Sequence, residues 1–318
     1  MRVLHLFAGA GGSLLTGRAL GWFPVGAVEW DSWRAALLAR RFPGLPHHGD
    51  VKTFHGAAFG PVDLVVGGSP CQDFTVSGTK RGLAGDRSAH ARDQVRVLGE
   101  SGARWHLWEN VPHAMKTPKE NPGADFAELQ ASIRAAGHPY MTWCLQSASD
   151  VGAPHRRTRL FLLSWRDAPP PLVQVTAMPH AWPAFGPPVE GEPERLVRKG
   201  DRKVWAARVA SLGDGWVPQQ AAAAWCRLVE QAHAGVASHS YVDTRKGWPT
   251  LVKHEPRLGY QDRSSGKRGT QTSLTTEVFN AAGLRPARGE KDPLGLNPEW
   301  CEAFMGWPRG WTDMEVGA

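Results

Sequence analysis

Short, almost uninterrupted apolar runs alternate with longer mixed segments along the first half of this chain. The runs lie at 3–7, 24–30, 62–68, 104–110 and 158–165, and the segments at 32–42 and 125–137 have the apolar spacing of helices. Runs this apolar are typical of strands buried on both faces, as in a parallel sheet covered by helices. The alternation therefore predicts an α/β fold, doubly wound around a mostly parallel sheet.

The sequence changes character after Trp165. Prolines recur between 168 and 193, which argues against regular helix there, and a helical segment returns at 219–233. From about 234 to 295 the chain is rich in Gly, Ser, Thr and Arg, so we expect loop-like structure in this part. Lys and Arg outnumber Asp and Glu by ten to six between 232 and 295, which suits contacts to phosphates; a disordered polar linker is the alternative interpretation.

Composition narrows the classes of protein. A net charge of +7 and a pI near 9.5 favour a polyanionic partner. The four cysteines lie far apart and form no CxxC pair, which argues against a zinc site or a disulfide framework and fits a reducing, cytoplasmic setting. The apolar run at the N-terminus is too short for a signal peptide, and no run approaches the length of a membrane span.

Polar and glycine-rich positions follow successive predicted strands, where ligands bind in this fold class. The glycines of FAGAGG permit close backbone approach to a ligand, and the next helix presents its positive N-terminal end. Glu29 can accept both hydroxyls of a ribose, Trp30 can stack on an adenine, and Asp50 can accept from an exocyclic amine. Because GxGxxG and a basic phosphate cluster are missing, the pattern favours S-adenosylmethionine over NAD or ATP.

A cysteine, a carboxyl group and two arginines also follow the predicted strands. Cys71 lies next to Pro70, and the adjacent glycines favour a rigid turn over the buried structural role usual for cysteine. Glu109 ends the next strand, and Arg157 and Arg159 point the same way if their segment is extended. Together these groups can hold a pyrimidine, add a thiolate to C6 and hydrogen-bond N3.

These motifs resemble those of the DNA cytosine-C5 methyltransferase family, in particular its compact phage and prophage forms. FAGAGGS, VEWD, GDV, GGSPCQDFTVSG, GLAGDRS, WENVP and GAPHRRTRLFLL stand in the family's order. The resemblance implies methyl transfer from S-adenosylmethionine to C5 of a cytosine flipped out of double-stranded DNA. It also suggests a monomeric, cytoplasmic enzyme of a bacterium or a phage-infected cell, with a role in restriction-modification or phage protection.

The resemblance also assigns roles to positions. Cys71 would attack C6, Glu109 would contact N3 and the exocyclic amine, Arg159 would bind O2, and Arg157 would order Glu109 and the Cys71 loop. The loop 77–88 would close over the flipped base. The implied cofactor contacts are Phe7, Ala8, Gly9, Gly11, Gly12, Glu29, Trp30, Asp50, Val51, Pro70, Asp214 and Gly215. The implied DNA contacts are Gln72, Ser77, Lys80, Arg81, Arg87, Arg245, Lys246, Arg263, Lys267 and Arg268.

The chain departs from the family pattern in its order of motifs. LGDGWVPQQA, which resembles the motif that completes the cofactor pocket, precedes the basic lobe and LNPEWCEAFMGWPRGWT. We therefore expect a local permutation with the recognition region at 235–295. The predicted domains are a catalytic and cofactor-binding domain over 1–231, with a proline-rich connection at 166–203 and the cofactor-completing helix at 204–231, and a target-recognition lobe over 232–318.

Two residues differ from the family's usual types. Asp214 stands where the family usually has Asn, which argues against a carboxylated form of the cofactor because like charges would meet. His155 stands in place of Gln, and either residue can donate a hydrogen bond. Two alternatives remain open: a catalytically altered or inert DNA-binding relative, and a methyltransferase that acts on RNA or on a free pyrimidine nucleotide.

Overall fold

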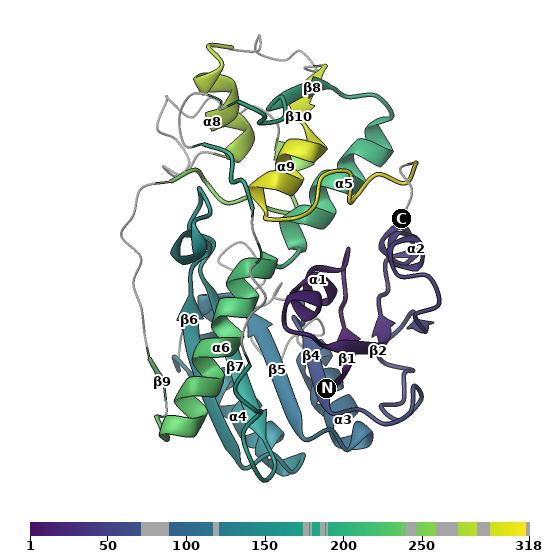
Figure 1. The fold of residues 1–318 in the computed structure, drawn as a ribbon, viewed down its shortest axis with the longest axis vertical. Coiled ribbons are helices and arrows are strands. Elements are labelled where there is room, and N and C mark those ends of the chain that lie inside the picture. The colour runs from purple at the N-terminus through teal and green to yellow at the C-terminus, as the bar shows by residue number, and fades with distance from the viewer. Residues whose placement is uncertain are drawn as a thin grey trace.

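An eight-stranded sheet runs through the larger of two lobes in the computed structural model of this protein (Figure 1). The structure describes residues 1–70, 89–116, 121–173, 178, 180–184, 188, 190–236, 238–239, 247–258, 273–284 and 293–315. The strand order is β3-β2-β1-β4-β5-β7-β6-β9. The strands are β1 (Arg2–Leu6), β2 (Phe23–Val28), β3 (His47–His48), β4 (Leu64–Gly67), β5 (Trp105–Asn110), β6 (Tyr140–Gln146), β7 (Arg159–Trp165) and β9 (Ser238–His239).

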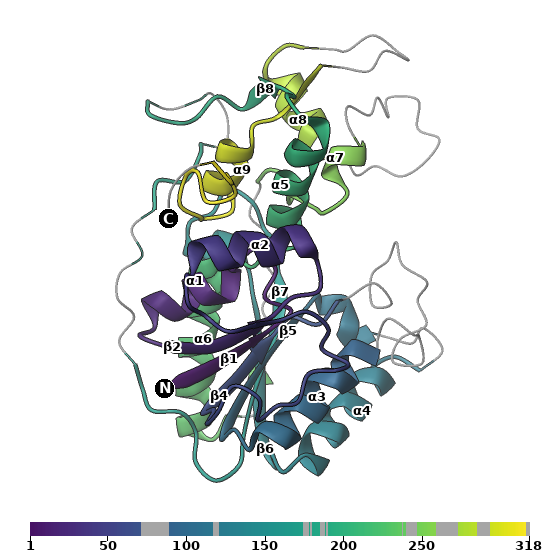
Figure 2. The same cartoon turned by 90° about the vertical axis from the view of Figure 1, so that its right-hand side faces the viewer.

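All pairs in this sheet are parallel except those of β7, which runs antiparallel to both β5 and β6. Helices α1 (Gly12–Ala19) and α6 (Pro218–Ala234) cover one face, and α3 (Ala89–Ser101) and α4 (Ala124–Ala135) cover the other (Figure 2). Adjacent residues of β1 point to opposite faces. Val3 packs in the cluster that holds α6, and Leu4 in the one that holds α3. Burial on both faces explains the apolar runs, and the predicted doubly wound α/β class is confirmed.

The smaller lobe combines segments from both sides of α6. Strand β8 (Leu196–Arg198) pairs antiparallel with β10 (Leu294–Leu296). Helix α5 (Arg202–Asp214) contacts α7 (Glu255–Leu258) and α9 (Pro298–Phe304). The sequence analysis assigned β8 and α5 to the first domain, whereas in the structure both pack against C-terminal segments (Figure 1).

The prediction of loop-like structure throughout 234–295 is wrong at α8 (Leu274–Ala281). Ser273 caps this helix by accepting from the backbone N–H of Thr276, which satisfies one of the free amides of the first turn. Leu274, Val278 and Phe279 are buried on this helix. Three apolar residues with a cap are enough for a short helix when neighbouring segments such as α7 and β10 pack against it.

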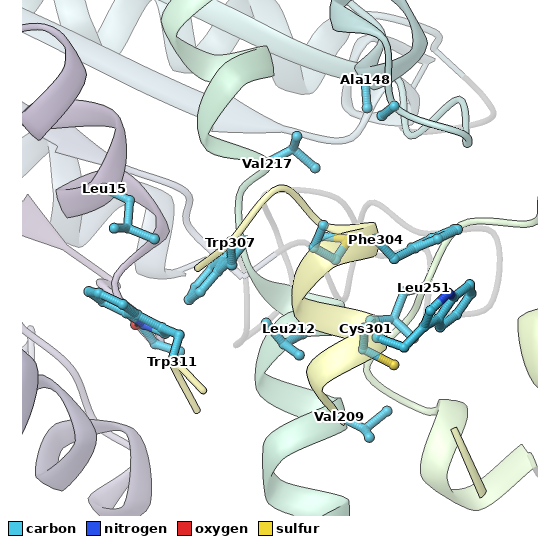
Figure 3. Close-up of a cluster of buried hydrophobic side chains, with 14 of the residues drawn as sticks. Leu15, Ala148, Val209, Leu212, Val217, Leu251, Cys301, Phe304, Trp307 and Trp311 are labelled. Carbon is cyan, nitrogen blue, oxygen red and sulfur yellow. The ribbon is translucent and has the colours of Figure 1, made fainter. Parts of the chain in front are cut away.

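The chain after α9 joins the two lobes. Figure 3 shows Trp307 and Trp311 extending from the end of α9 toward Leu15 of α1. The indole N–H of Trp311 donates to the carbonyl of Ala10 at 2.8 Å, and that of Trp307 donates to the carbonyl of Trp216 at 2.8 Å. Both tryptophans therefore anchor loops that border the cleft described below.

In the part of the chain that the structure describes, the remaining elements are α2 (Ser32–Arg41) and the 3-10 helices η2 (Pro112–Lys116) and η3 (Ala148–Val151). Helix α2 lies between the sheet and the smaller lobe (Figure 2). Asp31 caps α2 by accepting from the N–H of Arg34 at 3.0 Å. Within the described parts of the chain, no helix has the length and apolar character to cross a membrane.

Candidate functional site

A cleft of about 790 Å³ opens at the carboxyl ends of β1, β2, β4 and β5. Further walls come from the segment 49–52 after β3, the turn between α5 and α6 and the segment 252–254. The cleft is lined by fourteen of the predicted site residues: Phe7, Ala8, Gly9, Gly12, Glu29, Trp30, Asp50, Val51, Pro70, Glu109, Arg157, Arg159, Asp214 and Gly215. The fold thus brings together most of the positions that the sequence analysis singled out from segments far apart in the chain.

Left-handed backbone shapes the loop after β1. Phe7, Gly9 and Gly11 have φ values of 52°, 58° and 104°, and only glycine adopts this region without strain. A Cβ on Gly12 would lie 2.9 Å from the backbone nitrogen of Trp216, so this position requires glycine. Gly11 does not line the cleft, contrary to the prediction: it is the N-cap of α1 and packs against Trp311 and α2.

The carboxylate of Glu29 holds this loop to the end of β2. Its Oε2 accepts from the N–H of Gly9 at 2.7 Å, and its Oε1 accepts from the N–H of Asp31 at 2.9 Å. The side chain is buried, yet each carboxylate oxygen retains lone-pair capacity toward the cleft. Trp30 is 77% exposed at the rim and offers a broad aromatic face.

Asp50 and Val51 form the wall contributed by the segment after β3. The Asp50 carboxylate accepts from the N–H of Lys52 at 2.9 Å, which fixes a tight turn. Val51 is buried, and its carbonyl accepts from the guanidinium of Arg96 at 2.6 Å. The turn is therefore tied to α3 and presents an acceptor and an apolar surface side by side.

The end of β5 fixes the chain that leads to the cysteine. The indole of Trp108 donates to the hydroxyl of Ser69 at 2.9 Å, and the side-chain amide of Asn110 donates to the backbone carbonyl of Ser69 at 3.3 Å. Pro70 follows and lines the cleft. Cys71 is the next residue along the chain and lies outside the described residues.

The predicted DNA contacts also fall outside the residues that the structure describes. They are Gln72, Ser77, Lys80, Arg81, Arg87, Arg245, Lys246, Arg263, Lys267 and Arg268. Their assignment remains a prediction from the sequence.

Glu109 sits at the inner end of the cleft between two donors. Its Oε1 pairs with Nε of Arg159 at 3.1 Å, and the indole Nε1 of Trp216 lies near its Oε2 over Gly68. Burial raises the pKa of Glu109 above its usual range, opposed first by the charge of Arg159 and then by that of Arg157. This carboxyl group therefore retains a proton at higher pH than an exposed glutamate does.

Arg157 lines the cleft but is not part of an extended segment with Arg159, which is the condition under which the sequence analysis expected the two side chains to point the same way. Strand β7 begins only at Arg159, and Arg157 has a φ of 35°, so the alternation of an extended strand does not apply to it. Its buried guanidinium donates to the carbonyls of Leu251, Gly213 and Gly215 at 3.0, 3.0 and 2.7 Å. Arg157 therefore fastens the turn between α5 and α6 to the segment before α7.

Asp214 is compensated by two cations that the sequence analysis missed. Arg34 of α2 approaches its Oδ2 at 2.8 Å, and Lys253 approaches the same atom at 3.1 Å. A Cβ on Gly213 would lie 2.5 Å from the backbone nitrogen of Lys253, so the two segments touch through their backbones. The carboxylate thus joins three walls of the cleft.

His155, the other unusual residue, lies outside this network. It is fully buried, stacks on Phe304 at 4.4 Å between ring centroids, and bonds the carbonyl of Phe304 through Nε2 at 2.9 Å. Burial lowers the pKa of His155 to about 3, so its ring stays neutral and its role is packing between the lobes. Among the described residues, no group of three or more His, Cys, Asp or Glu side chains is arranged to hold a metal ion.

Comparisons with known proteins match the part of the chain that contributes most residues of this cleft. The family model for C-5 cytosine-specific DNA methylase matches residues 1–191. The type II methyltransferase M.AquIA of Picosynechococcus is 29% identical over 178 residues, which cover 52% of this chain and 72% of that protein. M2.BsuMI of Bacillus subtilis is 30% identical over 170 residues, covering 52% of this chain and 42% of that protein.

Solved structures match a similar share of the chain. The Dnmt2 methyltransferase of S. pombe aligns with a TM-score of 0.43 at 21% identity and covers 54% of this chain and 52% of its own. The chain therefore spans about half the length of several of the proteins it matches.

Proposed function

The chain belongs to the C-5 cytosine-specific DNA methylase family, and we propose that it transfers a methyl group from S-adenosylmethionine to C5 of a cytosine flipped out of double-stranded DNA. The single observation that carries this proposal is the arrangement of the cleft. An adenosine-type set formed by Glu29, Trp30 and Asp50 shares one cavity with the Glu109–Arg159 pair. Pro70, the neighbour of Cys71, lines the same cavity.

The residues of the cleft fit the cofactor. The exposed face of Trp30 suits an adenine, and the free lone pairs of Glu29 suit the ribose hydroxyls. Asp50 and Val51 suit the polar and apolar edges of the base. When bound, S-adenosylmethionine supplies an electrophilic methyl group on a sulfonium. The chain's part is to hold the donor so that the methyl group faces the base.

The base-binding end of the cleft fits addition to cytosine. The Cys71 thiolate would form a bond to C6, and the electron pair of the C5–C6 double bond would move toward C5 as Glu109 gives its proton to N3. C5 would then accept the methyl group as its bond to the sulfonium breaks, which would leave the donor's sulfur as a neutral thioether. The proton on C5 would pass to water, the bond between sulfur and C6 would break to restore the double bond, and N3 would return its proton to Glu109.

Arg159 has a second task in this scheme. Its Nε is engaged by Glu109, and one of its Nη atoms donates to the carbonyl of Thr158 at 3.0 Å. The guanidinium is thereby fixed in a plane beside the carboxyl group, and its remaining N–H groups can donate to O2 of the base. A donor at O2 stabilises the negative charge that develops in the ring during addition.

We propose double-stranded DNA as the partner and the smaller lobe as the part that contacts it. This proposal keeps the predicted division into 1–231 and 232–318, with the qualification that β8 and α5 of the first part pack in the smaller lobe. The basic residues between 245 and 268 are the ones expected to meet phosphates.

Bisulfite sequencing of DNA from cells that express the protein tests the activity and reports its target site. Methylated cytosines in one sequence context support the proposal, and unmodified DNA together with methylated RNA would replace it with an RNA-directed activity. DNA carrying 5-fluorocytosine should form a covalent adduct that survives denaturation, because the fluorine at C5 blocks the final elimination.

Cys71→Ser should abolish methyl transfer while leaving cofactor affinity within about tenfold, since the thiol is needed only for the covalent step. Cys226→Ser is the matched control. This half-buried cysteine of α6 lies outside the cleft, and burial raises the pKa of its thiol. Near-normal turnover in Cys71→Ser would contradict the mechanism.

A further inference from the structure

Trp216 connects the two functional ends of the cleft. It stands in the turn between α5 and α6, two residues after Asp214, and lines the cleft together with that residue. Its ring packs edge-on against Phe161 of β7, with 5.8 Å between centroids and an interplanar angle of 88°. Its carbonyl accepts from the indole of Trp307 at 2.8 Å. The side chain is therefore held from both sides and is 9% exposed.

The indole nitrogen of Trp216 and the carboxylate of Glu109 lie on either side of Gly68. A Cβ on Gly68 would lie 2.9 Å from Nε1 of Trp216 and closer still to Oε2 of Glu109. The two side chains therefore approach each other over the bare α-carbon of Gly68, just before the chain reaches Pro70. The indole N–H is thereby placed to donate to the carboxylate, while Oε1 is engaged by Arg159.

We propose that Trp216 is a positioning residue for Glu109, and that its indole N–H fixes the plane of the carboxyl group and ties it to the turn that carries Asp214. An isolated carboxyl group rotates about its bond to Cγ. With one donor at each oxygen, that rotation is restrained, and the remaining lone pairs are left for the base. The inference rests on the proposed function, because it assumes that Glu109 acts on N3.

Removing this donor has a predictable electrostatic effect. A hydrogen bond to a carboxylate favours its charged form, so the indole opposes the rise in the pKa of Glu109 that burial causes. Without the indole N–H, burial is less opposed and the pKa of Glu109 rises further. Glu109 then becomes a weaker acid toward N3, so transfer slows although the acid stays protonated up to higher pH.

The contact itself can be tested without catalysis. In a ¹H–¹⁵N spectrum of protein labelled at tryptophan, the chain's 15 indoles give separate signals, and the one missing in Trp216→Phe is assigned to Trp216. This signal should move during a pH titration of the wild type and stay still in Glu109→Gln. A signal that does not move, or that moves equally in Glu109→Gln, would overturn the proposal. If Trp216→Phe does not fold, sequential backbone assignment of the wild type identifies the same signal.

The catalytic consequence is read from single-turnover rates across pH. Trp216→Phe should lower the rate near neutral pH by roughly tenfold, the cost of a hydrogen bond to a charged group, and move the alkaline limb to higher pH. Trp225→Phe is the control, because Trp225 is buried in the same apolar cluster and its indole nitrogen has no hydrogen-bond partner within the described residues. Trp225→Phe should leave the alkaline limb of the pH–rate profile unchanged.

The outcomes separate this inference from the proposed function. A wild type without methyl transfer defeats the proposed function, and the titration of the indole signal still decides whether Trp216 orients Glu109. An active wild type whose alkaline limb is the same in Trp216→Phe defeats the inference alone. A limb that moves equally in Trp225→Phe also counts against it, because general loosening of the core would then explain the change.

Discussion

Glu29→Gln tests whether one carboxylate both builds the glycine loop and receives the cofactor. In the wild type the two oxygens accept from the backbone N–H groups of Gly9 and Asp31 at 2.7 and 2.9 Å. An amide keeps one oxygen and places an NH₂ group against the other N–H, so one hydrogen bond is lost and two donors face each other. Hydrogen bonds to charged groups contribute about 1.5–3 kcal/mol each, and this side chain is only 8% exposed.

We therefore expect Glu29→Gln to lower the free energy of unfolding by about 2–3 kcal/mol. The affinity for S-adenosylmethionine should fall by roughly 10- to 150-fold, which corresponds to about 1.5–3 kcal/mol. Thermal denaturation measures the first quantity and isothermal titration calorimetry the second. Calorimetry is run at a temperature where the variant remains folded.

Glu100→Gln is the matched control. Glu100 also accepts from a backbone amide, that of Gly56 at 2.8 Å, and pairs with Arg96, but it lies outside the cleft. This variant should lose stability and keep its cofactor affinity. If a folded Glu29→Gln protein binds the cofactor as tightly as the wild type, the reasoning about the pocket is refuted.

Two further predictions concern the charges and hydrogen bonds around the cleft, and a third concerns the basic residues expected to contact DNA. Asp214→Asn leaves Arg34 and Lys253 without their shared carboxylate, which is 35% exposed. A urea titration should therefore show a loss of only about 1 kcal/mol in the free energy of unfolding, and a gain in stability would contradict the ion pairs. Trp311→Phe removes the indole that donates to the carbonyl of Ala10. The free energy of unfolding should fall by about 1–3 kcal/mol, and backbone amides of the glycine loop should exchange faster with solvent. Unchanged exchange would show that the loop does not depend on this hydrogen bond. Replacing Lys267 and Arg268 with glutamine should lower the magnitude of the slope of log binding constant against log salt concentration by about 1.8, as measured by fluorescence anisotropy on DNA. An unchanged slope would mean that the DNA-binding surface does not include these two residues.

Strands β1, β2, β4, β5 and β7 could be predicted from sequence because their burial leaves an almost uninterrupted apolar run. Strand β6 was missed because it alternates: Thr142, Cys144 and Gln146 are buried while the residues between them are partly exposed. Helix α3 was not predicted, although Ala91, Val95 and Leu98 have the spacing of a buried helical face.

Within the site, residues at strand ends were found and those that act across the fold were not. Glu29 directly follows β2 and Glu109 lies at the carboxyl end of β5, so the topology alone places them at the same edge of the sheet. Arg34, Lys253 and Trp216 reach the cleft from elements whose approach depends on how the smaller lobe packs. No local pattern encodes such contacts, and for the same reason the binding of the Arg157 guanidinium to backbone carbonyls of distant segments could not be anticipated.

The anchoring of residue 10 by residue 311 has a consequence for how the protein is made. The ribosome adds about 5–20 residues per second, so on the order of tens of seconds separates the synthesis of the glycine loop from that of its indole partner. A similar delay separates the synthesis of Arg41 from that of its partners, since its guanidinium donates to the carbonyls of Trp311 and Asp313 at 2.7 and 2.8 Å. During elongation the nascent sheet can form with its ligand-binding edge still loose, and that edge becomes ordered only when the segment after α9 has left the exit tunnel.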